Sequence, residues 1–139
     1  MWTKSHSIVT KNATAAQMWK LFADVNNWHT WDKEIEYARM QGEFEKGNFF
    51  YLKPKKGPKV KIELAETIKN KRFVDLTRFP LAKMYGVHIF EETSAGLKIT
   101  TTMRVEGLLT PLWVKLVAGE IAAALPEEME QQVIIASKL

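Results

Sequence analysis

The sequence predicts an α+β fold in which a run of antiparallel strands is covered by one long C-terminal helix. Between residues 35 and 106, apolar and polar residues alternate in short segments separated by turn residues, which is typical of antiparallel strands. From residue 111 to residue 139, apolar residues recur every three or four positions, which is typical of a helix. Such a sheet needs a cover for its apolar face, and the C-terminal helix is the candidate.

The composition predicts the number of domains and excludes several kinds of functional site. With 139 residues, of which 46% are hydrophobic, we expect one domain over residues 1–139 with a sizeable core. The chain has no cysteine, which excludes disulfides, thiolate metal sites and cysteine nucleophiles. Its three histidines, His6, His29 and His88, lie too far apart for zinc-ligand spacing, and there is no phosphate-binding glycine loop. We therefore expect no metal and no cofactor.

The hydropathy of the chain indicates whether it inserts into a membrane and in which compartment we expect it. No apolar run approaches the roughly 20 residues that cross a bilayer. Residues 1–6 contain no apolar stretch of the kind found in a signal peptide. We expect a cytoplasmic protein that does not insert stably into a membrane.

The first third of the chain predicts one strand and two short helices. Residues 2–9 suit a strand, and Thr14 offers an N-cap oxygen to a helix over residues 15–23. Residues 24–27 break that helix, and Trp28 and Trp31 follow three positions apart in a second helical turn. Two tryptophans at this spacing can both face inward and close one end of the core.

Six further strands are predicted over residues 35–40, 48–52, 60–64, 73–79, 84–91 and 97–106. In the last of these, the residues expected to face the core are Leu97, Ile99, Thr101, Met103 and Val105. The strand over residues 84–91 leaves two registers open. Either Met84, Gly86, His88 and Phe90 face inward, or Tyr85, Val87 and Ile89 do.

The last segment predicts a helix that is long but not straight. Pro111 suits its first turn, because the missing N–H would be unpaired there in any case. Pro126 lies near the middle and is expected to kink or break the helix. The apolar stripe expected to face the sheet is Val114, Val117, Ile121, Leu125, Met129, Val133 and Ala136.

The order of these elements, with particular residues in place, resembles the START-like or SRPBCC helix-grip superfamily, and within it the polyketide cyclase/dehydrase-like proteins. The resemblance rests on residues 15–24, on Trp28 and Trp31 in the segment 27–32, on Gly47, on the segment 96–100, and on Gly107 before the long helix. It covers essentially the whole chain. It implies a curved antiparallel sheet of about seven strands that wraps around the C-terminal helix and encloses a cavity.

The resemblance also implies a function. Proteins of this superfamily bind lipids, hormones or polyketides, and some cyclise polyketides. We expect this chain to bind a small, mostly hydrophobic lipid-, polyketide- or aromatic-like molecule in the internal cavity. The alternative is a cyclase- or dehydratase-like enzyme that works without metal or nucleotide and uses His88 or Arg78.

Nine residues are candidates for the ligand site. His88 is an acid, a base or a polar anchor if it faces the cavity, and otherwise a solvent-exposed residue. Arg78 follows Val74 and Leu76 in phase and either meets an acidic ligand group at the cavity mouth or pairs with Asp75 or Glu63. The other candidates offer a phenol, aromatic gates or adaptable apolar contacts: Tyr85, Trp28, Trp31, Trp113, Met84, Phe90 and Met103.

One segment concentrates the positive charge of the chain. Eight of the 20 basic residues lie between Lys53 and Arg72, beside only two acidic ones. We expect an exposed hairpin at the edge of the sheet, whose lysines oppose edge-to-edge pairing. No aromatic residue lies between Lys53 and Lys71, so we expect no specific nucleic-acid partner.

Overall fold

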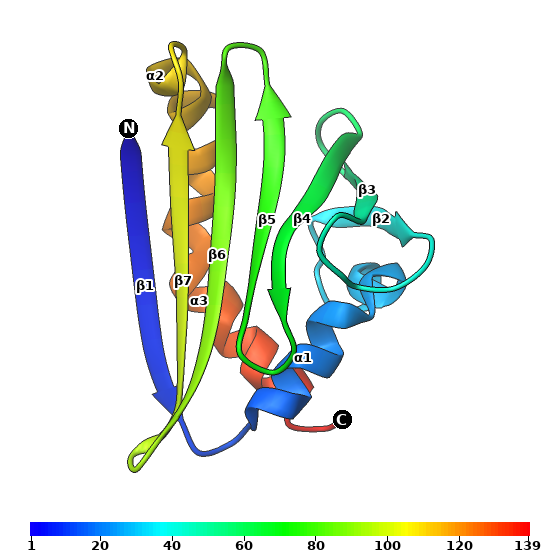
Figure 1. Cartoon of the computed structure of the whole chain (residues 1–139), viewed down its shortest axis with the longest axis vertical. Helices are drawn as coiled ribbons and strands as arrows, with labels where there is room; N and C mark the ends of the chain where they lie inside the picture. Colours follow the sequence, from blue (N-terminus) through cyan, green and yellow to red (C-terminus); the bar gives the residue numbers. More distant parts are fainter.

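The computed structural model describes all 139 residues and contains seven strands and a C-terminal helix (Figure 1). The strands are β1 (Trp2–Thr10), β2 (Ile35–Met40), β3 (Phe49–Pro54), β4 (Val60–Ile68), β5 (Arg72–Phe79), β6 (Ala82–Thr93) and β7 (Gly96–Glu106). Two short helices, α1 (Ala15–Ala23) and η1 (Val25–Thr30), follow β1. The chain ends with α2 (Thr110–Trp113), η2 (Val114–Ala118) and α3 (Gly119–Ala136). The predicted α+β fold is confirmed.

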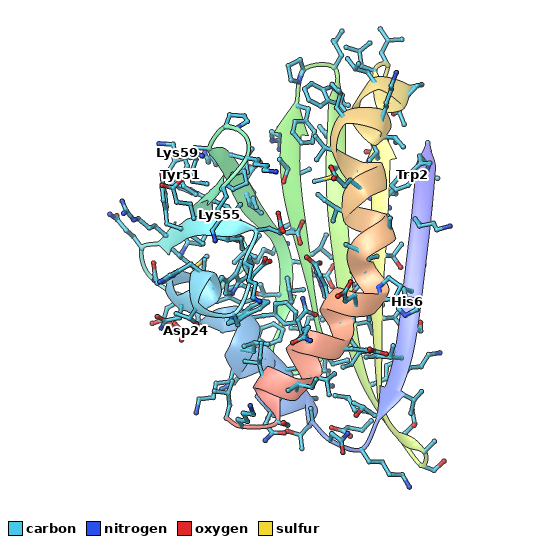
Figure 2. The ribbon with its side chains drawn as sticks, turned by 180° about the vertical axis from the view of Figure 1, so that it is seen from behind. Trp2, His6, Asp24, Tyr51, Lys55 and Lys59 are labelled. Carbon is cyan, nitrogen blue, oxygen red and sulfur yellow. The ribbon has the colours of Figure 1, made fainter.

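All seven strands form one antiparallel sheet in the order β1-β7-β6-β5-β4-β3-β2. The helix α3 lies across one face of this sheet, as the view from behind shows (Figure 2). The β2–β3 ladder has a register shift between Ile35 and Tyr37, and the β4–β5 ladder has one between Leu64 and Glu66. Bulges of this kind bend strands, and β2 and β3 turn away from the direction of the other strands in Figure 1.

The first helix begins where the sequence predicts. The Thr14 hydroxyl accepts a hydrogen bond from Gln17 N, and Gln17 Oε1 accepts one from Thr14 N, which makes a capping box. The side-chain amide of Gln17 also donates to the carbonyl of Leu139 at 3.1 Å. The start of α1 is thereby tied to the end of the chain.

The core lies between the sheet and the helices, where 26 buried apolar residues form one cluster. The five residues predicted to face inward from β7 are all buried. In β6, Met84, Gly86 and Phe90 are buried, and Tyr85 lies beneath Arg104 on the outer face. The register with His88 inward is therefore the one that the chain adopts.

The alternation in β5 differs from the expectation. Phe73 belongs to the core cluster, whereas Val74 and Leu76 are buried outside it, on the other face of the strand. Arg78 shares their phase and is exposed on that outer face. Of the two placements expected for Arg78, the one at the cavity mouth was wrong, because its phase in β5 puts it on the outer face, where it pairs with Glu63.

The C-terminal helix is built differently from the prediction. Residues 114–118 form a π-helical turn, in which the N–H of Gly119 donates to the carbonyl of Val114. A Cβ on Gly119 would lie 2.8 Å from that carbonyl oxygen, which explains the glycine. Pro126 lies inside α3 and does not break it, although the helix changes direction along its length in Figure 2. The turn also moves Ala118 and Ala122 into the buried stripe that Leu125 and Met129 continue.

The basic hairpin lies inside the sheet rather than at its edge. The hairpin of β3 and β4 has β2 on one side and β5 on the other. The two edges of the sheet are β1 and β2. The expectation that the lysines protect an edge was wrong, since β2 covers the hairpin there.

Candidate functional site

A cavity of about 190 Å³ lies between the sheet and α3. Its walls come from η1, from strands β3 to β7 and from α3, so elements from most of the chain meet around it. The apolar side chains are Trp28, Phe50, Ile62, Met84, Met103, Ile121, Leu125 and Met129, and the polar ones are Asp75, Thr77, His88, Thr101, Glu128 and Gln132. A larger depression of about 560 Å³ beside the turn between β5 and β6 is open to solvent. The cavity between the sheet and α3 is the less open of the two and is therefore the candidate site.

The first polar feature of the cavity is a pair formed by His88 and Asp75. Nε2 of His88 lies 2.9 Å from Oδ2 of Asp75, and both side chains are mostly buried. The imidazole stacks on the ring of Phe73, with 4.2 Å between centroids and 11° between planes. The carboxylate and the phenyl ring together fix the orientation of the imidazole. When Asp75 accepts a hydrogen from Nε2, Nδ1 of the neutral ring is left as an acceptor.

Gly86 makes this pair possible. It lies opposite Asp75 in the β5–β6 ladder. A Cβ at position 86 would lie 2.6 Å from Oδ2 of Asp75, which is closer than atoms of this kind approach. The absence of a side chain at Gly86 therefore leaves the space in which the Asp75 carboxylate reaches His88.

The second polar feature is Glu128, which α3 places on the wall of the cavity. Burial, together with the negative charges of Asp32 and Glu34, raises the pKa of Glu128 to about 7. Burial also raises the pKa of Asp32, against a hydrogen bond that its carboxylate accepts from the backbone of Glu34 at 3.0 Å. Three carboxyl groups thus lie close enough to affect one another.

Glu128 also lines a neighbouring depression at the surface, which we call the mouth. A depression of about 350 Å³ at the surface is lined by Glu128 together with Trp31, Asp32, Lys33, Glu34, Ala124, Glu127 and Gln131. Glu128 is the one residue that lines both this depression and the cavity. A molecule that enters from this side would pass its carboxyl group.

Four of the nine residues predicted for the site line the cavity: His88, Trp28, Met84 and Met103. Trp31 lines the mouth instead, packed against Phe22 with 6.3 Å between ring centroids. Phe90 is buried in the core, also beside Phe22.

The other three predicted residues lie away from the cavity. Arg78 donates to Glu63 at 2.7 Å on the outer face, which is one of the two pairings considered for it. Tyr85 lies on the outer face under the guanidinium of Arg104. Trp113 stacks on Phe79, and its indole N–H donates to the carbonyl of Pro80 at 2.9 Å.

Sequence reasoning missed two carboxyl groups of the site. Asp75 was considered only as a partner for Arg78, although it shares its phase in β5 with Phe73, a core residue. Glu128 and Gln132 follow Leu125 by three and seven positions, so they share its helical face. A polar residue in phase with core residues was the signal in both elements.

The structure contains no group of three or more histidine, aspartate or glutamate side chains that could hold a metal ion. None of its helices combines the length and the apolar character that a transmembrane helix requires.

The sequence matches one family of known proteins. A family model described as polyketide cyclase / dehydrase and lipid transport matches residues 1–133. No curated protein matches the sequence.

Similar folds occur in solved structures. A START superfamily protein from Mycobacterium smegmatis has a TM-score of 0.71 at 16% identity, over 94% of this chain and 96% of that one. Norcoclaurine synthase from Thalictrum flavum, in complex with dopamine and hydroxybenzaldehyde, has a TM-score of 0.74 at 11% identity, over 99% and 87%. A hypothetical protein from Helicobacter pylori has a TM-score of 0.76 at 14% identity, over 97% and 88%. At these identities the likeness concerns the fold.

Proposed function

The chain belongs to the polyketide cyclase / dehydrase and lipid transport family, and from this premise we propose that it binds a small, mostly apolar molecule in the cavity between the sheet and α3. The observation that carries the proposal is the lining of that cavity, where eight apolar side chains surround a few convergent polar groups. Pockets that bind small molecules have this composition. We also propose that residues 1–139 act as a single domain, since all strands share one sheet.

The volume of the cavity sets the size of the ligand. An apolar cavity of about 150 Å³ holds benzene, and this one has a volume of about 190 Å³. Pockets for drug-sized compounds occupy roughly 300–1,000 Å³. The proposed ligand is therefore about the size of one ring with a short substituent, and His88, Thr77 or Thr101 is its hydrogen-bonding anchor.

The six methionines provide a direct test of the proposal. Met84, Met103 and Met129 line the cavity, whereas Met1, Met18 and Met40 do not. We expect phenol, indole and 2-phenylethanol to shift the methyl NMR signals of the three cavity methionines in protein labelled with ¹³C-methyl methionine. The signals of the other three methionines serve as the internal control.

A variant with a filled cavity makes the test specific. Thr101→Leu adds volume at a buried position of the cavity wall, so it is expected to abolish the shifts. Unchanged signals from Met18 and Met40 would show that the variant is folded. Binding that survives Thr101→Leu, or shifts limited to Met1, Met18 and Met40, would contradict the proposal.

The pair of His88 and Asp75 favours a second candidate function, which is acid–base catalysis such as cyclisation or dehydration. An imidazole oriented by a carboxylate is a common general base, and Glu128 in the same cavity has a pKa suited to a general acid.

Exchange of the methyl protons of bound acetophenone with solvent deuterium would report this chemistry. A loss of exchange of about 100-fold in His88→Ala, with binding intact, would support an enzyme. Exchange no faster than in buffer would contradict it.

A further inference from the structure

The charges that line the cavity are of one sign. Two carboxyl groups, Asp75 and Glu128, line it, and no lysine or arginine does. Its remaining titratable side chain is His88, which is already paired with Asp75 at 2.9 Å. Glu128 forms no hydrogen bond or ion pair with another side chain of the protein. A carboxyl group without a cationic partner thus faces the ligand space.

The mouth repeats this pattern. Three further acidic residues, Asp32, Glu34 and Glu127, line it beside one lysine, Lys33. The charges of Asp32 and Glu34 act on Glu128 strongly enough to raise its pKa. An approaching molecule would therefore meet a negative field before it reached the cavity.

This field is local, because the chain as a whole is basic. The net charge of the chain is +4, and eight of its 20 basic residues lie between Lys53 and Arg72. None of those eight lines the cavity or its mouth. The acidic groups of the site are therefore separated from the basic segment, although the overall composition is basic.

One aromatic side chain in the cavity is also suited to a cation. The indole ring of Trp28 lines the cavity together with Glu128. Its N–H is already used, since it donates to the carbonyl of Phe22 at 3.0 Å. The face of an indole ring attracts an ammonium group, and more strongly where water is excluded.

We propose that the ligand of this cavity is a small organic cation, namely an apolar ring or short chain that bears a protonated amine, with the ammonium group beside Glu128. The inference rests on the function proposed above and names the chemical class of its ligand. The amine would donate charge-assisted hydrogen bonds to the Glu128 carboxylate, while the apolar part would contact Trp28 and the three cavity methionines. The cation would also offset the repulsion between Glu128 and the carboxyl groups of the mouth.

Three compounds with nearly the same shape test this inference. We would compare 2-phenylethylamine, 2-phenylethanol and 3-phenylpropanoate at pH 8 by calorimetry and by the methyl signals of Met84, Met103 and Met129. The amine is expected to bind about tenfold more tightly than the alcohol, because hydrogen bonds to a charged group are stronger than neutral ones. The carboxylate is expected to bind most weakly.

A matched pair of variants assigns the preference to Glu128. Glu128→Gln is expected to remove the advantage of the amine over the alcohol. Glu130→Gln has the same change in charge on an exposed residue of the same helix, and it is expected to leave both affinities unchanged.

The affinity for the amine is also expected to depend on pH. Glu128 faces Asp32 and Glu34 at the mouth and shares the cavity with Asp75 and His88. Because Glu128 loses its proton as the pH rises through about 7, the affinity for the amine should increase about tenfold between pH 5.5 and pH 8. The affinity for the alcohol should change much less, and Glu128→Gln should flatten the profile for the amine.

The outcomes separate this inference from the proposed function. An alcohol that binds as tightly as the amine, or an amine preference that survives Glu128→Gln, would overturn the inference and leave the apolar cavity site standing. No shift of the three methionine signals with any of the three compounds would contradict the proposed function, and the inference would fall with it.

Discussion

Gly86 shows how one residue without a side chain determines the chemistry of the site. Asp75 lies opposite it in the neighbouring strand and turns its carboxylate toward His88. A methyl group at position 86 would occupy the place of that carboxylate. Position 86 therefore controls whether His88 has a fixed partner.

We expect Gly86→Ala to lower the free energy of unfolding by about 1–3 kcal/mol, because the added methyl group displaces the Asp75 carboxylate from a packed site. The measurement is urea unfolding of four proteins: the wild type, Gly86→Ala, Asp75→Ala and the double variant. In the Asp75→Ala background the methyl group has room, so Gly86→Ala should cost much less there. Equal costs in both backgrounds would show that the two residues do not interact.

The site residues differ in how far the sequence predicts them. His88 was expected in the cavity in one of two registers, and apolar alternation could not choose between them, because Tyr85, Val87 and Ile89 are as apolar as Met84, Gly86 and Phe90. The choice depends on the outer face, where Arg104 covers Tyr85. That contact joins residues 19 positions apart on two different strands. The periodicity within a single strand therefore does not predict it.

Among the elements, the hairpin of β3 and β4 has a feature that its sequence does not indicate. Between Lys53 and Lys71 the sequence has no aromatic residue, yet the ladder brings two aromatic rings beside the lysines. The amine of Lys59 lies 4.9 Å from the ring centroid of Tyr51, and that of Lys61 lies 4.3 Å from the centroid of Phe49. Figure 2 shows Tyr51 and Lys59 close together at this end of the sheet, apart from α3. Both rings are therefore engaged by cations of the chain itself.

For this hairpin we expect only weak, salt-sensitive binding to polyanions, since the lysines contact phosphates without reading bases and the rings are not free to stack. Labelled DNA, RNA and anionic vesicles should bind at low salt and release the protein at about 150 mM salt, where screening acts beyond about 8 Å. The control is a variant in which Lys55, Lys56, Lys59 and Lys61 are replaced by Gln. Sub-micromolar binding at 150 mM salt that this variant abolishes would move the function to the hairpin.

The elements themselves were largely predictable, since each rests on local signals. The capping oxygen of Thr14 predicts the start of α1, and the apolar alternation of residues 97–105 predicts the buried face of β7. The π-helical turn of η2 was not predicted, because it depends on the approach of Gly119 to the Val114 carbonyl. A glycine within an apolar helical pattern does not distinguish a π-turn from an ordinary helix.

For the whole molecule, Glu128 makes stability depend on pH. The pKa of its carboxyl group rises from 4.5 to about 7 on folding, chiefly because of burial. Below about pH 4.5 the group is protonated in both states, so it contributes no pH dependence there. Between that value and about pH 7, the unfolded chain releases the proton and the folded protein keeps it. The stability therefore falls as the pH rises through this window and becomes constant above it.

We expect Glu128→Gln to remove this loss. Relative to the wild type, the variant should gain about 1–2 kcal/mol in free energy of unfolding between pH 5 and pH 8, a figure reduced for the partial exposure of the carboxyl group. Urea unfolding at the two pH values measures the difference, with Glu130→Gln as the control for a lost surface charge. A difference between wild type and Glu128→Gln that stays constant with pH would show that Glu128 titrates normally.

The pairing of β1 with β7 has a consequence for the order in which the chain folds. As an edge strand, β1 has β7 as its one neighbour, and the hydroxyls of Ser5 and Thr102 that meet at 2.9 Å are 97 residues apart. Contacts of such long range form slowly, because the intervening chain must close first. At roughly 5–20 residues per second of synthesis, the N-terminal strand spends about 5–20 s on the ribosome before its partner exists. We therefore expect β1 to join the sheet after β6 and β7 have paired, and its polar residues Thr3, Lys4, Ser5 and Ser7 to oppose pairing with other chains until then.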